Sequence, residues 1–149
     1  MPAIPIHWPS IASGWGSQFT RKAIDPVLVC PENIELDRYR KLAAVCLHPV
    51  SGRVVLDLAK AISGDGITTP NGDHYHALLQ QLGYGFPILS LAGSADLQCP
   101  PEAAARFGTE HRIFGRAYGE QVDYGHDDLV LGKFAPDETW PVILEWLDR

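Results

Sequence analysis

Cysteine is scarce in this chain, and the few cysteines present do not form a recognisable pattern. The sequence contains only Cys30, Cys46 and Cys99. Their odd number and wide spacing fit neither a CxxC metal motif nor a framework of paired disulfides. We therefore expect buried, unreactive thiols and a cytoplasmic protein, because reducing compartments keep cysteines unpaired.

Long apolar runs and basic clusters are also lacking. No run of about 18 apolar residues occurs, so we expect no membrane-spanning helix. Residues 1–8 lack the basic and apolar regions of a secretory signal peptide. Lysine and arginine number 12 against 18 acidic residues, which gives a net charge of −6. Without a basic cluster to follow phosphate groups, we expect no nucleic-acid partner.

The chain does have enough apolar residues for a folded core. Hydrophobic residues make up 46% and charged residues 20% of the 149 positions, which excludes a disordered protein and fits one globular domain. The start of the chain contains several residues that break regular structure, namely Pro2, Pro5, Pro9, Gly14, Gly16 and Pro26. Residues 1–29 are therefore expected to be an irregular N-terminal segment.

Residues 30–82 show helical periodicity and no strand pattern. The first helix is predicted over residues 32–47, and Pro49 ends it. A second helix is expected after Ser51, whose hydroxyl can cap its first turn. A third is expected after Asp73, which can act as its cap. This part of the chain is therefore predicted to be a small helical region.

Two groups of side chains suggest a ligand, but a structural interpretation fits each better. His74 and His76 could hold a metal, yet residues two apart on a helix face different directions, so we expect solvated histidines and no metal. Dispersed tryptophans could line a lipid pocket, but we expect core positions for them. The tryptophans are Trp8, Trp15, Trp140 and Trp146.

Residues 83–149 alternate between strand and helix patterns. A buried strand is predicted over residues 88–92, and a helix opened by proline over 101–107. A second strand is expected over 111–118, and a last helix from Pro136 onward. This order predicts the α/β class, with two or three parallel strands and flanking helices. The last helix carries an apolar stripe made of Trp140, Ile143, Leu144 and Leu147.

An aspartate and a histidine stand where chemistry is expected in this segment. Asp96 follows the first strand after the small residues 93–95, which allow a sharp turn. His126 lies in a loop after the second strand, directly behind Gly125. An acid after one strand and a histidine after the next are typical of an orienting acid and a general base.

Other aspartates near His126 have simpler interpretations. Asp127 and Asp128 are both placed to cap a helix that follows the histidine loop. Asp128 is expected to stabilise the loop rather than to take part in chemistry, and Asp123 is interpreted in the same way. Asp96 and His126 are therefore the predicted catalytic residues.

Residues 87–147 resemble the C-terminal part of the α/β-hydrolase fold superfamily, and their ending resembles that of lipases and esterases. The resemblance rests on Pro-Ile-Leu-Ser-Leu-Ala-Gly-Ser-Ala-Asp, on Tyr-Gly-His-Asp-Asp-Leu-Val-Leu-Gly and on the following Ala-Pro. Residues 30–82 more loosely resemble the helical cap of such enzymes. In this family the triad order is nucleophile, acid, histidine. The resemblance implies Asp96 as the acid and His126 as the base, with no cofactor.

The nucleophile of this family is missing from the sequence. It should lie in a Gly-x-Ser-x-Gly turn between a strand and a helix. None of the seven serines has glycine both two positions before and two positions after it. The chain therefore looks like the cap and C-terminal half of a hydrolase of about twice the length.

The resemblance implies a serine-type hydrolase acting on a small acyl ester, in which this chain carries the acid and the histidine. The isolated chain is expected to be inactive, because nucleophile and base act as a unit. Its partner would be a separate N-terminal hydrolase half or a second copy. The alternatives are a non-catalytic assembly or binding module, or a truncated pseudo-enzyme fragment.

Overall fold

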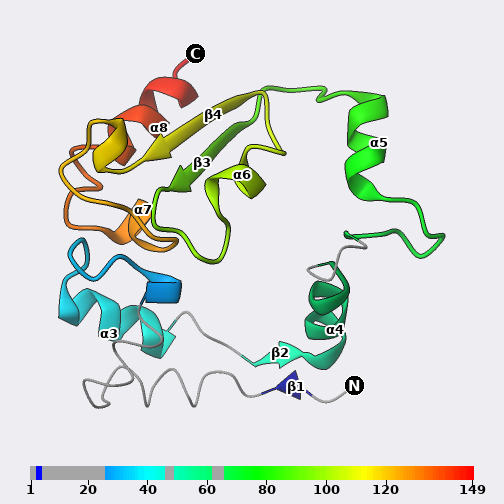
Figure 1. Cartoon of the computed structure of the whole chain (residues 1–149), viewed down its shortest axis with the longest axis horizontal. Helices are drawn as coiled ribbons and strands as arrows, with labels where there is room; N and C mark the ends of the chain where they lie inside the picture. The colour runs from blue at the N-terminus through cyan, green and yellow to red at the C-terminus, as the bar shows by residue number, and fades with distance from the viewer. Residues whose placement is uncertain (1–2, 5–25, 46–48, 62–65) are drawn as a thin grey trace.

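The computed structural model describes residues 3–4, 26–45, 49–61 and 66–149 (Figure 1). The C-terminal part of this structure contains a small parallel sheet. Its strands β3 (Leu89–Gly93) and β4 (Glu110–Phe114) pair in register from Leu89 opposite Glu110. The helix α6 (Pro101–Ala104) lies in the connection between them. The predicted α/β class is therefore confirmed, with two parallel strands in the described residues.

The second strand is shorter than predicted, since β4 ends at Phe114 and a 3-10 helix, η2 (Arg116–Tyr118), follows it. At this point side-chain carboxylates accept the hydrogen bonds of the backbone N–H groups. The N–H of Gly115 donates to Glu120 Oε2 at 2.8 Å, and that of Arg116 donates to Asp123 Oδ1 at 3.1 Å. The N–H of Arg116 would be the next donor toward β3, and because Asp123 accepts it, the pairing ends there.

The core lies between the sheet and two C-terminal helices, α7 (Asp128–Leu131) and α8 (Thr139–Leu147). Its four buried residues come from β4, from the chain after it and from α7. They are Phe114, Val122, Tyr124 and Leu129, with Leu91, Phe134 and Val142 packed against them.

The apolar stripe predicted for α8 is wrong as a description of its buried face. Leu144 and Leu147 are 60% and 64% exposed, whereas Thr139 is fully buried and Val142 contacts the core. The hydroxyl of Thr139 donates to the carbonyl of Leu129 at 2.6 Å. This buried hydrogen bond fixes the rotation of the helix, so a polar residue faces inward and two leucines face outward.

The core positions predicted for the tryptophans are also wrong for Trp140, which is exposed. Its indole N–H donates to the carbonyl of Val130 at 3.0 Å, so the ring lies over the end of α7. Trp146 is half-buried. Trp8 and Trp15 lie outside the described residues.

The helix α3 (Leu36–Val45) begins later than predicted and packs beside the C-terminal part (Figure 1). Residues 30–33 form a turn instead of a first helical turn, with the N–H of Asn33 donating to the carbonyl of Cys30 at 2.9 Å. Tyr39 and Val29 are buried. The segment around α3 therefore contributes individual buried side chains, although most of the residues of α3 described by the structure are exposed.

Two further helices, α4 (Gly52–Lys60) and α5 (Tyr75–Leu82), stand apart from the sheet (Figure 1). The predicted Ser51 cap is confirmed, since its Oγ accepts the N–H of Arg53 at 3.3 Å. The predicted Asp73 cap is wrong. Asp73 instead closes a turn, with its N–H donating to Thr69 Oγ1 at 3.1 Å, and α5 has no side-chain cap.

The prediction that residues 30–82 contain no strand is also wrong. A short strand, β2 (Val50–Ser51), pairs antiparallel with β1 (Ala3–Ile4). An isolated bridge joins Thr68 to His74. The pairing of β2 with β1 depends on a distant partner, and both pairings are too short to leave a period of two in the local sequence.

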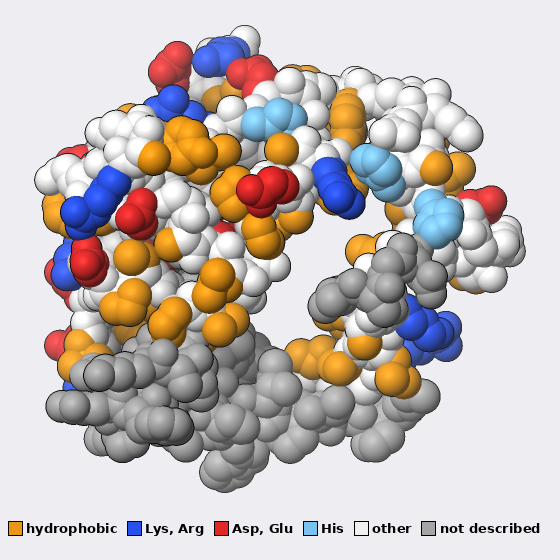
Figure 2. Space-filling model, viewed as in Figure 1, with side chains coloured by type: hydrophobic (Ala, Val, Ile, Leu, Met, Phe, Trp, Pro, Cys, Tyr) orange, Lys and Arg blue, Asp and Glu red, His pale blue; other side chains and the backbone are white. Residues whose placement is uncertain are grey.

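Neither α4 nor α5 contains a buried residue. Hydrophobic side chains are instead exposed along α4, and Figure 2 shows them at the surface. They include Val54, Val55, Leu56 and Leu58. These helices therefore have apolar surface that the described residues leave uncovered. None of the helices in the described parts has the length and apolar character needed to cross a bilayer.

Candidate functional site

Asp96 is held in a turn at the end of β3. Its N–H donates to the carbonyl of Gly93 at 3.1 Å. Its Oδ1 accepts two backbone N–H groups, from Gln98 at 2.8 Å and from Cys99 at 2.9 Å. Because one oxygen is occupied by the backbone, the carboxylate cannot rotate freely. Its other oxygen, Oδ2, is directed at the histidine loop.

The structure brings the two predicted site residues together. His126 Nδ1 lies 2.8 Å from Asp96 Oδ2. The Asp96 side chain is only 2% exposed, whereas that of His126 is 43% exposed. With the proton on Nδ1, the ring donates to the carboxylate and keeps a lone pair on Nε2. No side chain of the described residues hydrogen-bonds Nε2, so an outside group can reach it.

The acid turn packs directly on the chain that precedes the histidine. The N–H of Ala95 donates to the carbonyl of Tyr124 at 2.8 Å, and that of Ser94 donates to the carbonyl of Phe114 at 2.8 Å. A Cβ atom on Gly93 would lie 2.2 Å from the same Tyr124 oxygen. Glycine at position 93 therefore allows the close approach on which the Asp96–His126 distance depends.

We expect Gly93→Ala to lower the free energy of unfolding by about 1–3 kcal/mol, because the new methyl group meets backbone rather than a side chain that can rotate. Gly85→Ala is the matched control, since a Cβ atom there meets nothing within 4 Å. Urea unfolding followed by circular dichroism measures both. Equal midpoints for the two variants would contradict the close approach.

The histidine loop is tied down on both sides of His126. Before it, the N–H of Gly125 donates to Asp128 Oδ1 at 2.9 Å. After it, the N–H of Asp127 donates to the carbonyl of Leu28 at 3.0 Å. The backbone that carries the imidazole is therefore fixed by contacts with Asp128 and with the distant segment around Leu28.

Asp128 is fully buried and stabilises the loop, as predicted. Besides Gly125 it accepts the N–H of Cys30 at 3.0 Å and the side-chain amide of Asn33 at 2.9 Å. Burial raises the pKa of Asp128, and the hydrogen bonds from Cys30, Gly125 and Asn33 oppose this shift. All of these partners are donors, so they match the carboxylate form.

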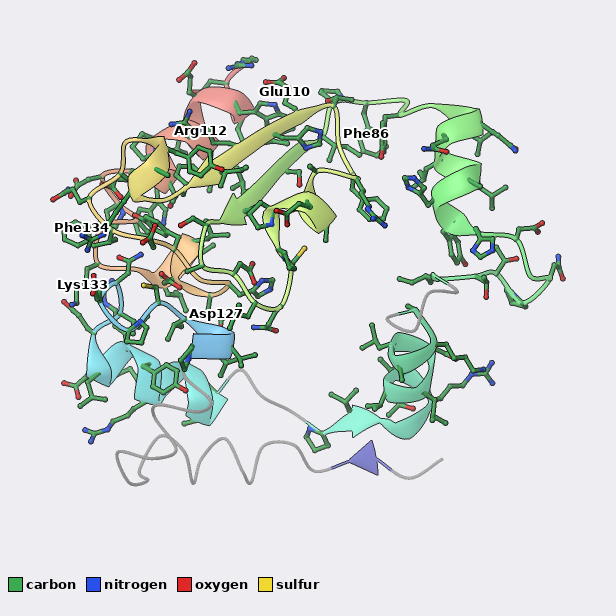
Figure 3. The ribbon with its side chains drawn as sticks, viewed as in Figure 1. Phe86, Glu110, Arg112, Asp127, Lys133 and Phe134 are labelled. Carbon is green, nitrogen blue, oxygen red and sulfur yellow. The ribbon has the colours of Figure 1, made fainter. Side chains whose placement is uncertain are left out.

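Sequence reasoning missed the part that residues 28–33 have at this site. Asn33 and Asp128 are 95 positions apart, and Cys30 takes part through its backbone. Figure 3 shows Lys133 and Phe134 beside this segment, and the N–H of Lys133 donates to the carbonyl of Asn33 at 2.6 Å. No local motif marks such residues, because their partners are distant backbone groups and one buried carboxylate.

Asp123 and Asp127 differ in their surroundings. Asp123 Oδ1 accepts the hydroxyl of Ser94 at 2.7 Å and the N–H of Arg116, which fits the predicted role in the loops. Asp127 lies at the start of α7 without a side-chain cap. Burial raises the pKa of Asp127, and the charge of nearby His126 opposes this shift.

None of the described serines is placed as a nucleophile. Ser90 donates to the carbonyl of Ala104 at 2.8 Å, Ser94 donates to Asp123, and Ser51 caps α4. None of these hydroxyls hydrogen-bonds His126. The remaining serines, Ser10, Ser13, Ser17 and Ser63, lie outside the described residues.

The described thiols are unpaired, and both are partly exposed rather than fully buried. Burial raises the pKa of Cys30 and of Cys99, so neither is activated as a thiolate. Cys46 is outside the described residues. Within the described ranges no group of His, Cys, Asp or Glu could hold a metal, and His76 Nε2 contacts Gln80 Nε2 at 3.0 Å.

The site is thus a buried, backbone-anchored carboxylate next to a half-exposed imidazole. Such a pair can accept a proton at Nε2 and stabilise the resulting imidazolium. Comparison with protein-family models, with curated proteins and with solved structures gave no match for this chain.

Proposed function

We propose that this chain supplies the acid and the base of a serine-type hydrolase of the α/β-hydrolase fold, acting on a small acyl ester. The observation that carries the proposal is the 2.8 Å contact between His126 Nδ1 and Asp96 Oδ2, with only the imidazole open to solvent. The sequence around both residues, and their order along the chain, support the family.

In the proposed reaction His126 Nε2 takes the proton of a serine hydroxyl as this attacks the ester carbonyl. It then returns the proton to the leaving alcohol and repeats the cycle with water. The N–H groups of Gln98 and Cys99 hold Oδ1 of Asp96, so that Oδ2 stays directed at His126. The carboxylate holds the Nδ1–H tautomer and stabilises the imidazolium.

The nucleophile and the oxyanion donors are proposed to come from another polypeptide segment that adds to the free edge of β3. The N–H of Glu110 donates to the carbonyl of Ile88, and that of Ser94 donates to the carbonyl of Phe114. Even-numbered backbone groups of this strand therefore face β4. By the alternation of a strand, Leu89 and Leu91 direct theirs to the opposite edge, where the described residues contain no partner strand.

The helices α4 and α5 are proposed to act as a cap over an acyl pocket. Their exposed apolar side chains support this role, because a surface that the chain leaves uncovered suits an apolar substrate or a covering segment. In the complete enzyme these helices would limit access of water to the reacting carbonyl.

We expect the purified chain to show no burst of labelling by a fluorophosphonate, a reagent that reacts with activated serines. The reason is that the described hydroxyls are bonded elsewhere, as Ser94 is to Asp123. Mass spectrometry of the intact chain measures the adduct. Rapid labelling at one serine would show that the chain carries its own nucleophile.

Co-expression tests the proposal itself. The chain is produced together with a neighbouring reading frame that encodes a Gly-x-Ser-x-Gly turn, and hydrolysis of a p-nitrophenyl acyl ester is measured. We expect activity in the mixture that is lost with His126→Ala. Activity that survives this change, or a mixture that stays inactive although the two chains bind, would refute the proposed role.

A second candidate function is a non-catalytic assembly module. The observation that favours it is exposed apolar side chains on two separate elements, Leu82 and Phe86 in and after α5 and Leu144 and Leu147 on α8; Phe86 is labelled in Figure 3. Sedimentation equilibrium distinguishes the two. A defined oligomer whose stability does not change in His126→Ala, without activity in any mixture, would favour assembly.

A further inference from the structure

We propose that Asn33 and Asp128 form a buried pair that positions His126. Residues 28–33 are then part of the functional site. The proposal rests on the proposed function, because positioning matters only if His126 acts as a base. Asn33 and Asp128 are positioning residues: neither contacts the reacting atoms, and both act through the loop that carries the imidazole.

The imidazole needs such support because its own contacts hold it weakly. Its side chain is 43% exposed, and its one hydrogen bond among the described residues goes to Asp96. The orientation of a half-exposed ring depends on the backbone at residues 125–127. Asp128 binds Gly125 on one side of His126, and the carbonyl of Leu28 binds Asp127 on the other.

Both anchors lead to the same N-terminal segment. Asp128 Oδ1 binds Cys30, and its Oδ2 accepts the amide of Asn33 at 2.9 Å. Asn33 in turn accepts the N–H of Phe134 on its Oδ1 at 3.3 Å. A Cβ atom on Gly125 would lie 2.7 Å from the nitrogen of Cys30, so the loop and the segment touch. Any shift of residues 28–33 must therefore move the backbone of His126.

Residues 28–33 are also held by hydrogen bonds and an ion pair at the surface. Glu32 Oε2 accepts from Arg116 at 2.6 Å, and the Glu32 carbonyl accepts the Lys133 ammonium at 2.8 Å. These contacts are exposed and contribute little stability. The buried Asn33–Asp128 pair is the stronger constraint, because both residues are fully buried and an unpaired group there has no water to bind.

The pair offers a test in which hydrogen bonds are broken and then restored. In Asp128→Asn either orientation of the new amide points an NH₂ group at a donor, since Cys30, Gly125 and Asn33 all donate. In Asn33→Asp two carboxylates face each other. In the double variant the amide at position 128 donates to the carboxylate at position 33, which still accepts from Phe134. The exchange restores the hydrogen bonds that join positions 33 and 128 to each other and to Cys30, Gly125 and Phe134, and it keeps the net charge.

The experiment uses the full ¹⁵N-labelled chain and follows the His126 ring by NMR. The ring nitrogen shifts report the fraction of the Nδ1–H tautomer, and saturation transfer reports the exchange of that proton with water. We expect Asp128→Asn and Asn33→Ala each to speed this exchange about tenfold or more. The double variant should return to the value of the parent chain.

Thr139→Val is the matched control. It removes a buried hydrogen bond to the carbonyl of Leu129, in the same core, without touching residues 125–127. It should lower the unfolding midpoint and leave the His126 proton unchanged. If Thr139→Val speeds the exchange equally, or if the pair variants leave it unchanged, the positioning role is refuted.

The outcomes separate this proposal from the proposed function. If the ring nitrogen shifts show that His126 of the parent chain is not in the Nδ1–H form, the contact with Asp96 is absent and both proposals fail. If the signal is present but insensitive to Asn33 and Asp128, only the positioning role fails. If Asp128→Asn does not fold, Asn33→Ala against Thr139→Val still decides.

Discussion

Replacing Asp96 by asparagine should lower kcat for ester hydrolysis on the order of 10⁴-fold in the complemented enzyme. The backbone around position 96 explains why so small a change has so large an effect. Gln98 and Cys99 both donate to Oδ1, so the remaining oxygen of the new amide stays there. The NH₂ group must then face His126 Nδ1.

A donor at that place selects the wrong tautomer of the histidine. The ring can accept from the amide only with its proton on Nε2, and Nε2 is the atom that must take the serine proton. Stopped assays with a p-nitrophenyl ester measure kcat for the two enzymes. A change in KM with kcat unchanged would contradict this role, because the orienting acid contributes to the chemical step.

Asp137→Asn is the control for this substitution. Asp137 is an exposed aspartate in the chain between α7 and α8. Its replacement by asparagine is the same chemical change at a place that does not contact the site. It should leave kcat unchanged. A comparable loss in this variant would show that the effect arises from net charge or stability and not from the tautomer of His126.

The positions of Asp96 and His126 follow from local sequence, which is why they could be predicted. Asp96 follows an apolar run and small residues, and His126 follows a glycine in the loop after the next strand. The parallel pairing of β3 with β4 brings the two together. The catalytic role itself stays a prediction. The α/β class was predictable for the same reason, since alternation of strand and helix is a local property of the chain.

The remaining features depend on distant partners. Asn33 reaches Asp128 across 95 positions, and nothing in the sequence near Asn33 indicates a buried acceptor. The rotation of α8 depends on one hydroxyl, that of Thr139, which competes successfully with two leucines for the buried face. Hydrophobic periodicity places apolar stripes, but a buried polar group with a matched acceptor can outweigh it.

The expected boundary between residues 82 and 83 also depends on contacts between distant parts of the chain. The helical pattern of residues 30–82 is uniform, so the sequence predicts the same kind of helix for α3 as for α4 and α5. In the structure the segment before α3 binds the histidine loop, whereas α4 and α5 bury no residue of their own. Similar helices thus differ in their role because only one of them is preceded by residues that match Asp128.

The second large effect is expected for Asp128→Ala, which should lower the free energy of unfolding by about 3 kcal/mol or more. The change leaves the N–H groups of Cys30 and Gly125 and the amide of Asn33 without their acceptor. Each unsatisfied buried donor costs about 1–3 kcal/mol. Release of a buried carboxylate offsets part of this cost, because burial raises the pKa of Asp128.

Asp127→Ala is the neighbouring control, since Asp127 makes no side-chain cap at the start of α7. It should change the free energy of unfolding by less than about 1 kcal/mol. Urea unfolding followed by circular dichroism measures both. Equal losses in the two variants would mean that net charge near His126, and not the acceptor for residues 30–33, sets the stability of the loop.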